Sequence, residues 1–149
     1  LPVASAQIKS CLLLAGLYAD GKTHVIENGI SRDHTERMLR GFGYKVNTSP
    51  GEVSILGGGN LKACNIEVPS DISSSAFFMV AASIAKEADI TLLAVNVNPT
   101  RTGVIDILRL MGANIELINE RLEAGELIAD IRVCSSKLKG IKIPATIYF

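Results

Sequence analysis

The sequence predicts a mixed α/β fold of the α+β class, built from two copies of one helix–strand–helix–strand–strand unit. Apolar residues switch between helical and strand spacing along the chain, and the whole order of elements starts again after about 69 residues. The chain has 149 residues, of which 48% are hydrophobic and 20% are charged. It can therefore bury a core and is not disordered.

The first half is expected to hold two helices. Ser5 caps the first, which continues to about Tyr18, and either Ser31 or Asp33 caps the second, which Gly43 ends. Four further segments have the residue pattern of strands. They are Thr23–Glu27, Tyr44–Thr48, Val53–Leu56 and Leu61–Val68.

The second half repeats this order. Asp71 or Ser73 caps an apolar helix that continues to about Ala85, and Thr100 caps a further helix that Gly112 closes. The strands expected here are Ile90–Val95, Asn114–Ile118, Ile128–Cys134 and Leu138–Ile143.

The repeat can be checked position by position. A shift of about 69 residues aligns Ser5 with Ser74, Arg32 with Arg101, Arg40 with Arg109 and Gly43 with Gly112. Matched arginines and a matched helix-ending glycine indicate one supersecondary unit used twice. Because Pro69 stands at the junction, the predicted units are residues 1–68 and 69–149.

Composition argues against several classes of protein. The 15 Lys and Arg residues balance the 15 Asp and Glu residues, which argues against a nucleic-acid partner, and no apolar stretch is long enough to cross a membrane. Cys11, Cys64 and Cys134 lie far apart and form no CxxC pair. This favours reduced thiols in a cytoplasmic protein over disulfides or a zinc site.

Candidate chemistry lies at two helix starts. Ser5, Ala6 and Gln7 combine small and polar side chains with the free N–H groups and positive dipole end of a helix, which suit a phosphate or carboxylate. Arg32 comes just before the next helix and can reach an anion at the same end. From these residues alone, a plain capped helix and a solvated arginine remain open alternatives.

Other patterns are weaker. Arg101 repeats Arg32 in the second half, but the acidic Asp71 makes the helix start there a poorer anion site. His34 has acidic neighbours, yet positions so close on a helix do not converge on a metal ion. Gly57–Gly59 lacks the Lys-Ser/Thr that follows a phosphate loop, so it predicts a turn.

Several long motifs together resemble one enzyme family, the 5-enolpyruvylshikimate-3-phosphate (EPSP) synthases, and in particular its bacterial, glyphosate-tolerant class. The motifs occur in the family's order and cover nearly the whole chain. They are Leu1–Ser10 (LPVASAQIKS), Arg32–Leu39 (RDHTERML), Val68–Phe77 (VPSDISSSAF), Asn98–Gly103 (NPTRTG), Met111–Ala113 and Ser135–Gly140 (SSKLKG).

The resemblance implies the enolpyruvyl transferase fold, whose repeated βαβαββ units form two domains, with one of the two units here in each domain. It implies transfer of the carboxyvinyl group of phosphoenolpyruvate to shikimate-3-phosphate, in the shikimate pathway of aromatic amino acid biosynthesis. No cofactor or metal is implied, and the intact enzyme is expected to be a cytoplasmic monomer.

The resemblance also assigns site residues. Ser5, Ala6 and Gln7 would hold shikimate-3-phosphate, with Gln7 also reaching phosphoenolpyruvate. Arg32 would contact the phosphate of shikimate-3-phosphate, and Ser31 beside it is a possible further contact. Arg101 matches a motif of the family without an implied substrate role.

The resemblance covers a central part of the family's sequence. The family's N-terminal Lys-Ser and Arg would precede Leu1, and its catalytic Asp would follow Pro144, where residues 145–149 depart from the family pattern. We therefore expect no catalytic residue in this chain and no catalysis by the chain alone. Two alternatives remain: a UDP-N-acetylglucosamine enolpyruvyl transferase, and a non-catalytic α/β module that binds anions.

Overall fold

The computed structural model describes residues 1–144 and 147, and the chain divides into two compact units, Leu1–Ile66 and Glu67–Phe149. The departure from the family pattern expected at residues 145–149 falls outside the described residues, apart from Ile147. In the described part of the chain, no helix combines the length and the apolar character needed to span a bilayer.

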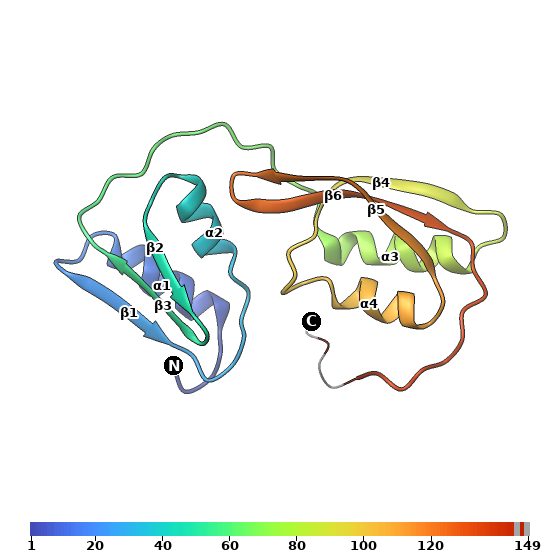
Figure 1. Ribbon diagram of the computed structural model, residues 1–149, viewed down its shortest axis with the longest axis horizontal. Helices are drawn as coiled ribbons and strands as arrows, with labels where there is room; N and C mark the ends of the chain where they lie inside the picture. Colours follow the sequence, from blue (N-terminus) through green and yellow to red (C-terminus); the bar gives the residue numbers. More distant parts are fainter. Residues whose placement is uncertain (145–146, 148–149) are drawn as a thin grey trace. The chain divides into compact units, whose positions relative to one another are not determined.

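The first unit is a three-stranded antiparallel sheet with two helices (Figure 1). Its elements are α1 (Ala6–Gly16), β1 (Lys22–Ile26), α2 (His34–Gly41), β2 (Val46–Ser49) and β3 (Glu52–Leu56). The strand order is β1–β3–β2, so β3 is central. Val25 lies opposite Val53, and Val46 lies opposite Ile55.

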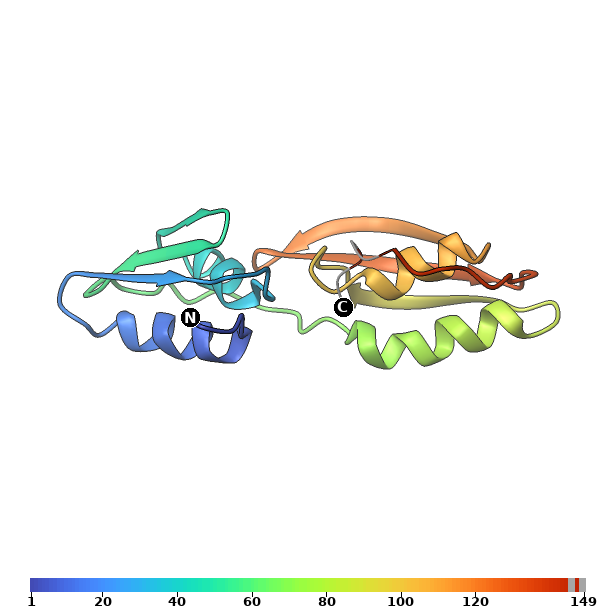
Figure 2. The same cartoon turned by 90° about the horizontal axis from the view of Figure 1, so that it is seen from below.

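One core holds this unit together. Leu13 of α1 and Leu39 of α2 are buried with Val25, Val53 and Ile55 of the sheet. Alternate residues of a strand face the same side, so both helices cover the same face of the sheet. Figure 2 shows α1, in blue, along one side of its strands. Burying these side chains is the main stabilising contribution to the unit.

The second unit has the same architecture. Its elements are α3 (Ile72–Ile84), β4 (Asp89–Asn96), α4 (Gly103–Leu110), β5 (Asn114–Glu123) and β6 (Glu126–Cys134). The strands are antiparallel in the order β4–β6–β5, again with the last strand in the centre. Met79, Ile105 and Ile131 are among its fully buried side chains. The predicted repeat of helix–strand–helix–strand–strand is therefore confirmed.

The two copies match closely after their first helix. Helices α2 and α4 each begin two residues after a matched arginine, Arg32 or Arg101. Each helix is followed by a glycine with positive φ, 75° at Gly43 and 94° at Gly112. The predicted alignment of Ser5 with Ser74 is wrong, because the residue that caps α3 as Ser5 caps α1 is Asp71.

Two predicted strands are absent from the described chain. Residues 61–68 alternate in polarity as a strand does, but they are mostly exposed and join no sheet. Lys62 donates one backbone hydrogen bond to the carbonyl of Phe42. Residues 138–143 are likewise irregular, with one such bond from Lys139 to Met111. Alternation indicates a strand only where a neighbouring strand supplies the hydrogen-bond partners.

The helix caps differ in part from expectation. Ser5 and Asp71 accept hydrogen bonds from the backbone N–H groups of Ile8 and Ser74, as N-caps do. Asp33 precedes α2 but makes no capping bond, because its carboxylate accepts from Arg37 Nε at 2.9 Å. The predicted cap Thr100 is wrong, since α4 begins after Thr102. The hydroxyl of Thr100 instead donates to Asn98 Oδ1 at 2.8 Å.

Candidate substrate-binding site

The start of α1 presents an unneutralised helix N-terminus. Ser5 is the N-cap, with extended backbone, and its Oγ accepts a hydrogen bond from Ile8 N at 3.4 Å. The N–H groups of Ala6 and Gln7 precede the first helical hydrogen bond, which runs from Lys9 N to Ser5 O. The first turn contains no acidic residue. These features leave a partial positive charge that favours an anion.

Arg32 lines a pocket together with the first residues of α1. A surface pocket of about 460 Å³ runs along α1, where Ala6, Gln7, Ser10, Cys11 and Leu14 line it, and it is closed by Arg32, just before α2, and by His34 and Thr35 of α2. Ser5–Gln7 therefore lie at the start of α1, and Arg32 shares a pocket with Ala6 and Gln7. Ser5 itself stands at the edge of this group, as the cap of the helix.

The guanidinium of Arg32 is available to a ligand. Within residues 1–144 and 147 it forms neither an ion pair nor a hydrogen bond, and its side chain is half-buried. A planar guanidinium and the N–H groups of a helix start are both suited to the oxygens of a phosphate or carboxylate. The pocket can therefore hold an anion without first breaking an internal contact of Arg32.

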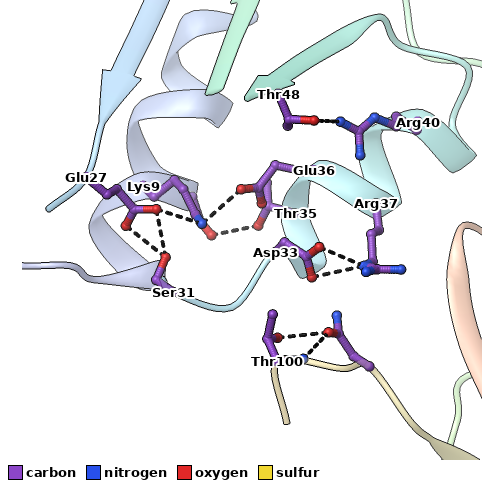
Figure 3. Close-up of polar contacts among 12 residues, drawn as sticks. Lys9, Glu27, Ser31, Asp33, Thr35, Glu36, Arg37, Arg40, Thr48 and Thr100 are labelled. Carbon is purple, nitrogen blue, oxygen red and sulfur yellow. Dashed lines mark hydrogen bonds and ion pairs between the residues drawn. The ribbon is translucent and has the colours of Figure 1, made fainter. Parts of the chain in front are cut away.

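Ser31 is placed elsewhere. Its hydroxyl donates to the carboxylate of Glu27, at 2.8 Å to Oε1 and 2.9 Å to Oε2 (Figure 3). It does not line the pocket that Ala6, Gln7 and Arg32 share. The structure thus brings together three of the five candidate residues, keeps Ser5 adjacent as their helix cap, and engages Ser31 with Glu27.

A buried ion-pair network next to residues of this pocket was not predicted from the sequence. Lys9 Nζ lies 2.9 Å from Glu27 Oε2 and 2.9 Å from Glu36 Oε1, and all three side chains are at most 7% exposed. Burial alone would lower the pKa of Lys9, but hydrogen bonds and charges from Glu36 and Glu27 outweigh it and hold that pKa above its usual value. Lys9 is therefore charged at neutral pH.

One signal in the sequence pointed to Lys9. It shares one face of α1 with Leu13 and Gly16, at spacings of four and seven residues, and all three are buried. A lysine on the core-facing side of a helix requires a buried acidic partner. The sequence does not show which acidic residues these are, because Glu27 and Glu36 are far from Lys9 along the chain.

The equivalent position in the second unit is neutralised from within. Arg101 Nη2 lies 3.4 Å from Asp71 Oδ1, and Asp71 accepts from Ser74 N at 3.0 Å. That backbone hydrogen bond is the main cause of the lowered pKa of Asp71, with Arg101 a smaller one. The start of α3 and Arg101 thus already bind the carboxylate of Asp71. This agrees with the prediction that Asp71 makes this helix start a poorer anion site.

The described residues give no indication of metal chemistry. No group of three or more His, Cys, Asp and Glu side chains in that part of the chain is arranged to hold a metal ion. Cys11, Cys64 and Cys134 are free thiols. The groups of the first unit that are chemically suited to an anion are the helix start of α1 and the guanidinium of Arg32.

Comparison with known proteins gives a consistent picture. The family model described as EPSP synthase (3-phosphoshikimate 1-carboxyvinyltransferase) matches residues 1–148. The 3-phosphoshikimate 1-carboxyvinyltransferase of Vesicomyosocius okutanii is 65% identical over 144 residues, which are 97% of this chain and 33% of that protein. The enzyme of the same name from Hydrogenovibrio crunogenus is 64% identical over 149 residues, with 97% of this chain and 34% of that protein covered.

A solved structure agrees with these relatives. The EPSP synthase from Acinetobacter baumannii has a TM-score of 0.93 and 59% sequence identity, over 97% of this chain and 33% of that one. The chain thus spans about a third of the length of the relatives it matches. The predicted resemblance is confirmed, and the chain belongs to the EPSP synthase family.

Proposed function

We propose that this chain supplies part of the substrate site of an enzyme that transfers the carboxyvinyl group of phosphoenolpyruvate to shikimate-3-phosphate. The observation that carries the proposal is the pocket that Arg32 shares with Ala6 and Gln7 of α1, in which Arg32 has no hydrogen bond or ion pair with any described residue. Family membership gives the reaction its identity. The remaining site residues would lie in the two thirds of the relatives' length that this chain does not match.

Within this proposal the first unit holds shikimate-3-phosphate. Arg32 and the N–H groups at the start of α1 bind anionic oxygens, and Gln7 offers a carboxamide that both donates and accepts hydrogen bonds. The family resemblance implies that Gln7 would reach both substrates. The role of Ser31 in this proposal is indirect, because its hydroxyl is bonded to Glu27.

The proposal includes an assignment of the units to domains. Residues 1–68 would form a repeat unit of one EPSP synthase domain and residues 69–149 a unit of the other, which is supported by the repeated topology. It also includes phosphoenolpyruvate as second substrate, a cytoplasmic location and a monomeric enzyme, and it makes the enzyme a glyphosate target of the tolerant class, all implied by family resemblance. No metal ion or cofactor is part of the proposed reaction.

Two preparations measured side by side test the proposal. In an assay of phosphate release with both substrates, we expect turnover by the full-length protein and none by the 149-residue chain. The reason is that general acid–base catalysis requires its proton-transfer groups within hydrogen-bond reach of the substrate. A full-length protein without enolpyruvyl transfer would refute the proposed activity. Turnover by the 149-residue chain at the full-length rate would refute the division of the site.

A further inference from the structure

Lys9 joins three elements of the first unit. It lies on α1, four residues after the cap Ser5, and its ammonium contacts Glu27, just beyond β1, and Glu36 in the first turn of α2 (Figure 3). Both N···O distances are 2.9 Å, and the Lys9 side chain is 4% exposed. Since a buried charge of this kind is fixed by its partners, the three elements are held in one arrangement.

The two partners of Lys9 lie on either side of Arg32 in the sequence. Glu27 accepts both hydrogen bonds from Ser31, the residue immediately before Arg32. Glu36 follows Arg32 by four residues, in the first turn of α2. The segment that carries Arg32 is thus tied at both ends, through one ammonium, to the helix whose first turn carries Gln7.

A second bridge reinforces the same geometry. The hydroxyls of Ser10 and Thr35 are 2.6 Å apart, and they join the residue after Lys9 to the residue before Glu36. Both hydroxyl-bearing residues line the pocket that Arg32 faces. The polar contacts between α1 and the start of α2 therefore concentrate directly beside the candidate site.

This network is expected to add little to the free energy of folding by itself. It buries two carboxylates against one ammonium, and no donor among the described residues reaches Glu36 Oε2. Replacement of buried ion pairs by apolar side chains is often neutral or stabilising, because desolvation offsets the attraction. What the network provides that apolar packing does not is a fixed position for hydrogen-bonded side chains, which a binding site requires.

We infer that Lys9 is a positioning residue, which sets the place of Arg32 relative to the start of α1 and so determines the affinity for shikimate-3-phosphate. The inference rests on the proposed function. Lys9 itself does not touch the substrate in this arrangement, because it does not line the pocket that Arg32 shares with α1 and its ammonium is held by both carboxylates.

The test uses the full-length protein with Lys9→Met, which keeps most of the length of the side chain and removes its charge. We expect KM for shikimate-3-phosphate to rise about tenfold while kcat changes less than about threefold, since a misplaced binding group weakens substrate binding. Lys45→Met is the matched control, because Lys45 is exposed and does not line the pocket. Its KM should equal that of the wild type.

A double-mutant cycle separates positioning from a general structural role. In an Arg32→Ala background, Lys9→Met should change KM no further, because the group that Lys9 positions is already absent. A structural role would give two effects that multiply. The inference is overturned if the effects of the two substitutions on KM multiply. It is also overturned if folded Lys9→Met has the KM of the wild type.

A second variant, Glu27→Gln, tests the inference if Lys9→Met does not fold. Glu27→Gln removes a charge but keeps the shape, and it weakens the link between Lys9 and Ser31. We expect KM for shikimate-3-phosphate to rise about threefold to tenfold in this variant, and a wild-type KM overturns the inference. Wild-type protein without enolpyruvyl transfer would overturn the proposed function together with the inference. An active wild type with an unchanged KM in these variants overturns the inference alone.

Discussion

Arg40 and Arg109 make the same contact in the two units. Arg40 Nη2 donates to the carbonyl of Val46 at 3.3 Å, and Arg109 Nη2 donates to the carbonyl of Ile115 at 3.1 Å. In both units the Nε atom bonds to the same oxygen. Each arginine therefore ties the end of a helix to the first residues of the following strand, at positions that the sequence repeat aligns.

We predict that loss of either contact destabilises its own unit. Arg40→Met and Arg109→Met should each lower the free energy of unfolding by about 1–2 kcal/mol, a discounted value for a partly exposed hydrogen bond from a charged donor. Hydrogen exchange of β2 and β5 amides measures the effect unit by unit. Faster exchange in both units of either variant would contradict independent roles for the two arginines.

The parts of the fold that depend on local sequence patterns were predictable. Helices, helix ends and most strands follow from local spacing and from capping residues, so Gly43 and Gly112 correctly marked the ends of α2 and α4. Residues 61–68 have strand spacing but no strand beside them. Pairing between strands depends on tertiary structure, which local periodicity does not encode.

The candidate site was predictable to a similar extent. Helix-start chemistry and the resemblance located Gln7 and Arg32, which the structure brings to one pocket. The partners of Lys9 could not be found in this way, because the ion pairs join residues that meet only when α1, β1 and α2 pack together. The bond from Ser31 to Glu27 spans only four residues, but it depends on the backbone conformation of the loop between them, which the sequence pattern does not specify.

The two helix-ending glycines should be costly to replace. Gly43→Ala and Gly112→Ala place a Cβ atom at φ values of 75° and 94°, where L-residues are strained, and each should cost about 1–2 kcal/mol of stability. Steric contact adds little, since the nearest atoms are 3.2 Å away on the flexible Lys62 side chain and 3.6 Å away at Lys137 O. Thermal or urea unfolding measures the loss.

Gly140 supplies the control for this pair. A Cβ atom added there would meet nothing within 4 Å, so Gly140→Ala should change stability by less than about 0.5 kcal/mol. Equal losses at Gly140 and Gly43 would show that backbone conformation is not the cause.

The cap of α3 should give stability that depends on pH. Asp71→Ala removes the side chain that accepts from Ser74 N and should cost about 1 kcal/mol at pH 7. The same bond lowers the pKa of Asp71 in the folded protein. Its contribution is therefore present above the pKa of an unfolded Asp, about 3.9, and is lost as pH falls through the lower folded value.

Urea unfolding at several pH values between 7 and 3 checks this expectation. The difference between wild type and Asp71→Ala should shrink as the pH falls below about 4. Asp71→Asn is the control, because asparagine caps helices without a titratable group. A difference from Asp71→Ala that stays constant over the whole range would show that ionisation of Asp71 does not stabilise the helix.

The final prediction compares the two aligned arginines, Arg32 and Arg101, in the full-length protein. Arg32→Ala should weaken binding of shikimate-3-phosphate by about 1.5–3 kcal/mol, the usual contribution of a hydrogen bond to a charged group. Arg101→Ala should change it little, because Arg101 is already paired with Asp71 while Arg32 has no internal partner among the described residues. Calorimetric titration measures both affinities, and thermal unfolding confirms that each variant is folded. Wild-type affinity in folded Arg32→Ala would mean that Arg32 is a solvated charge at a helix start and that the anion binds elsewhere.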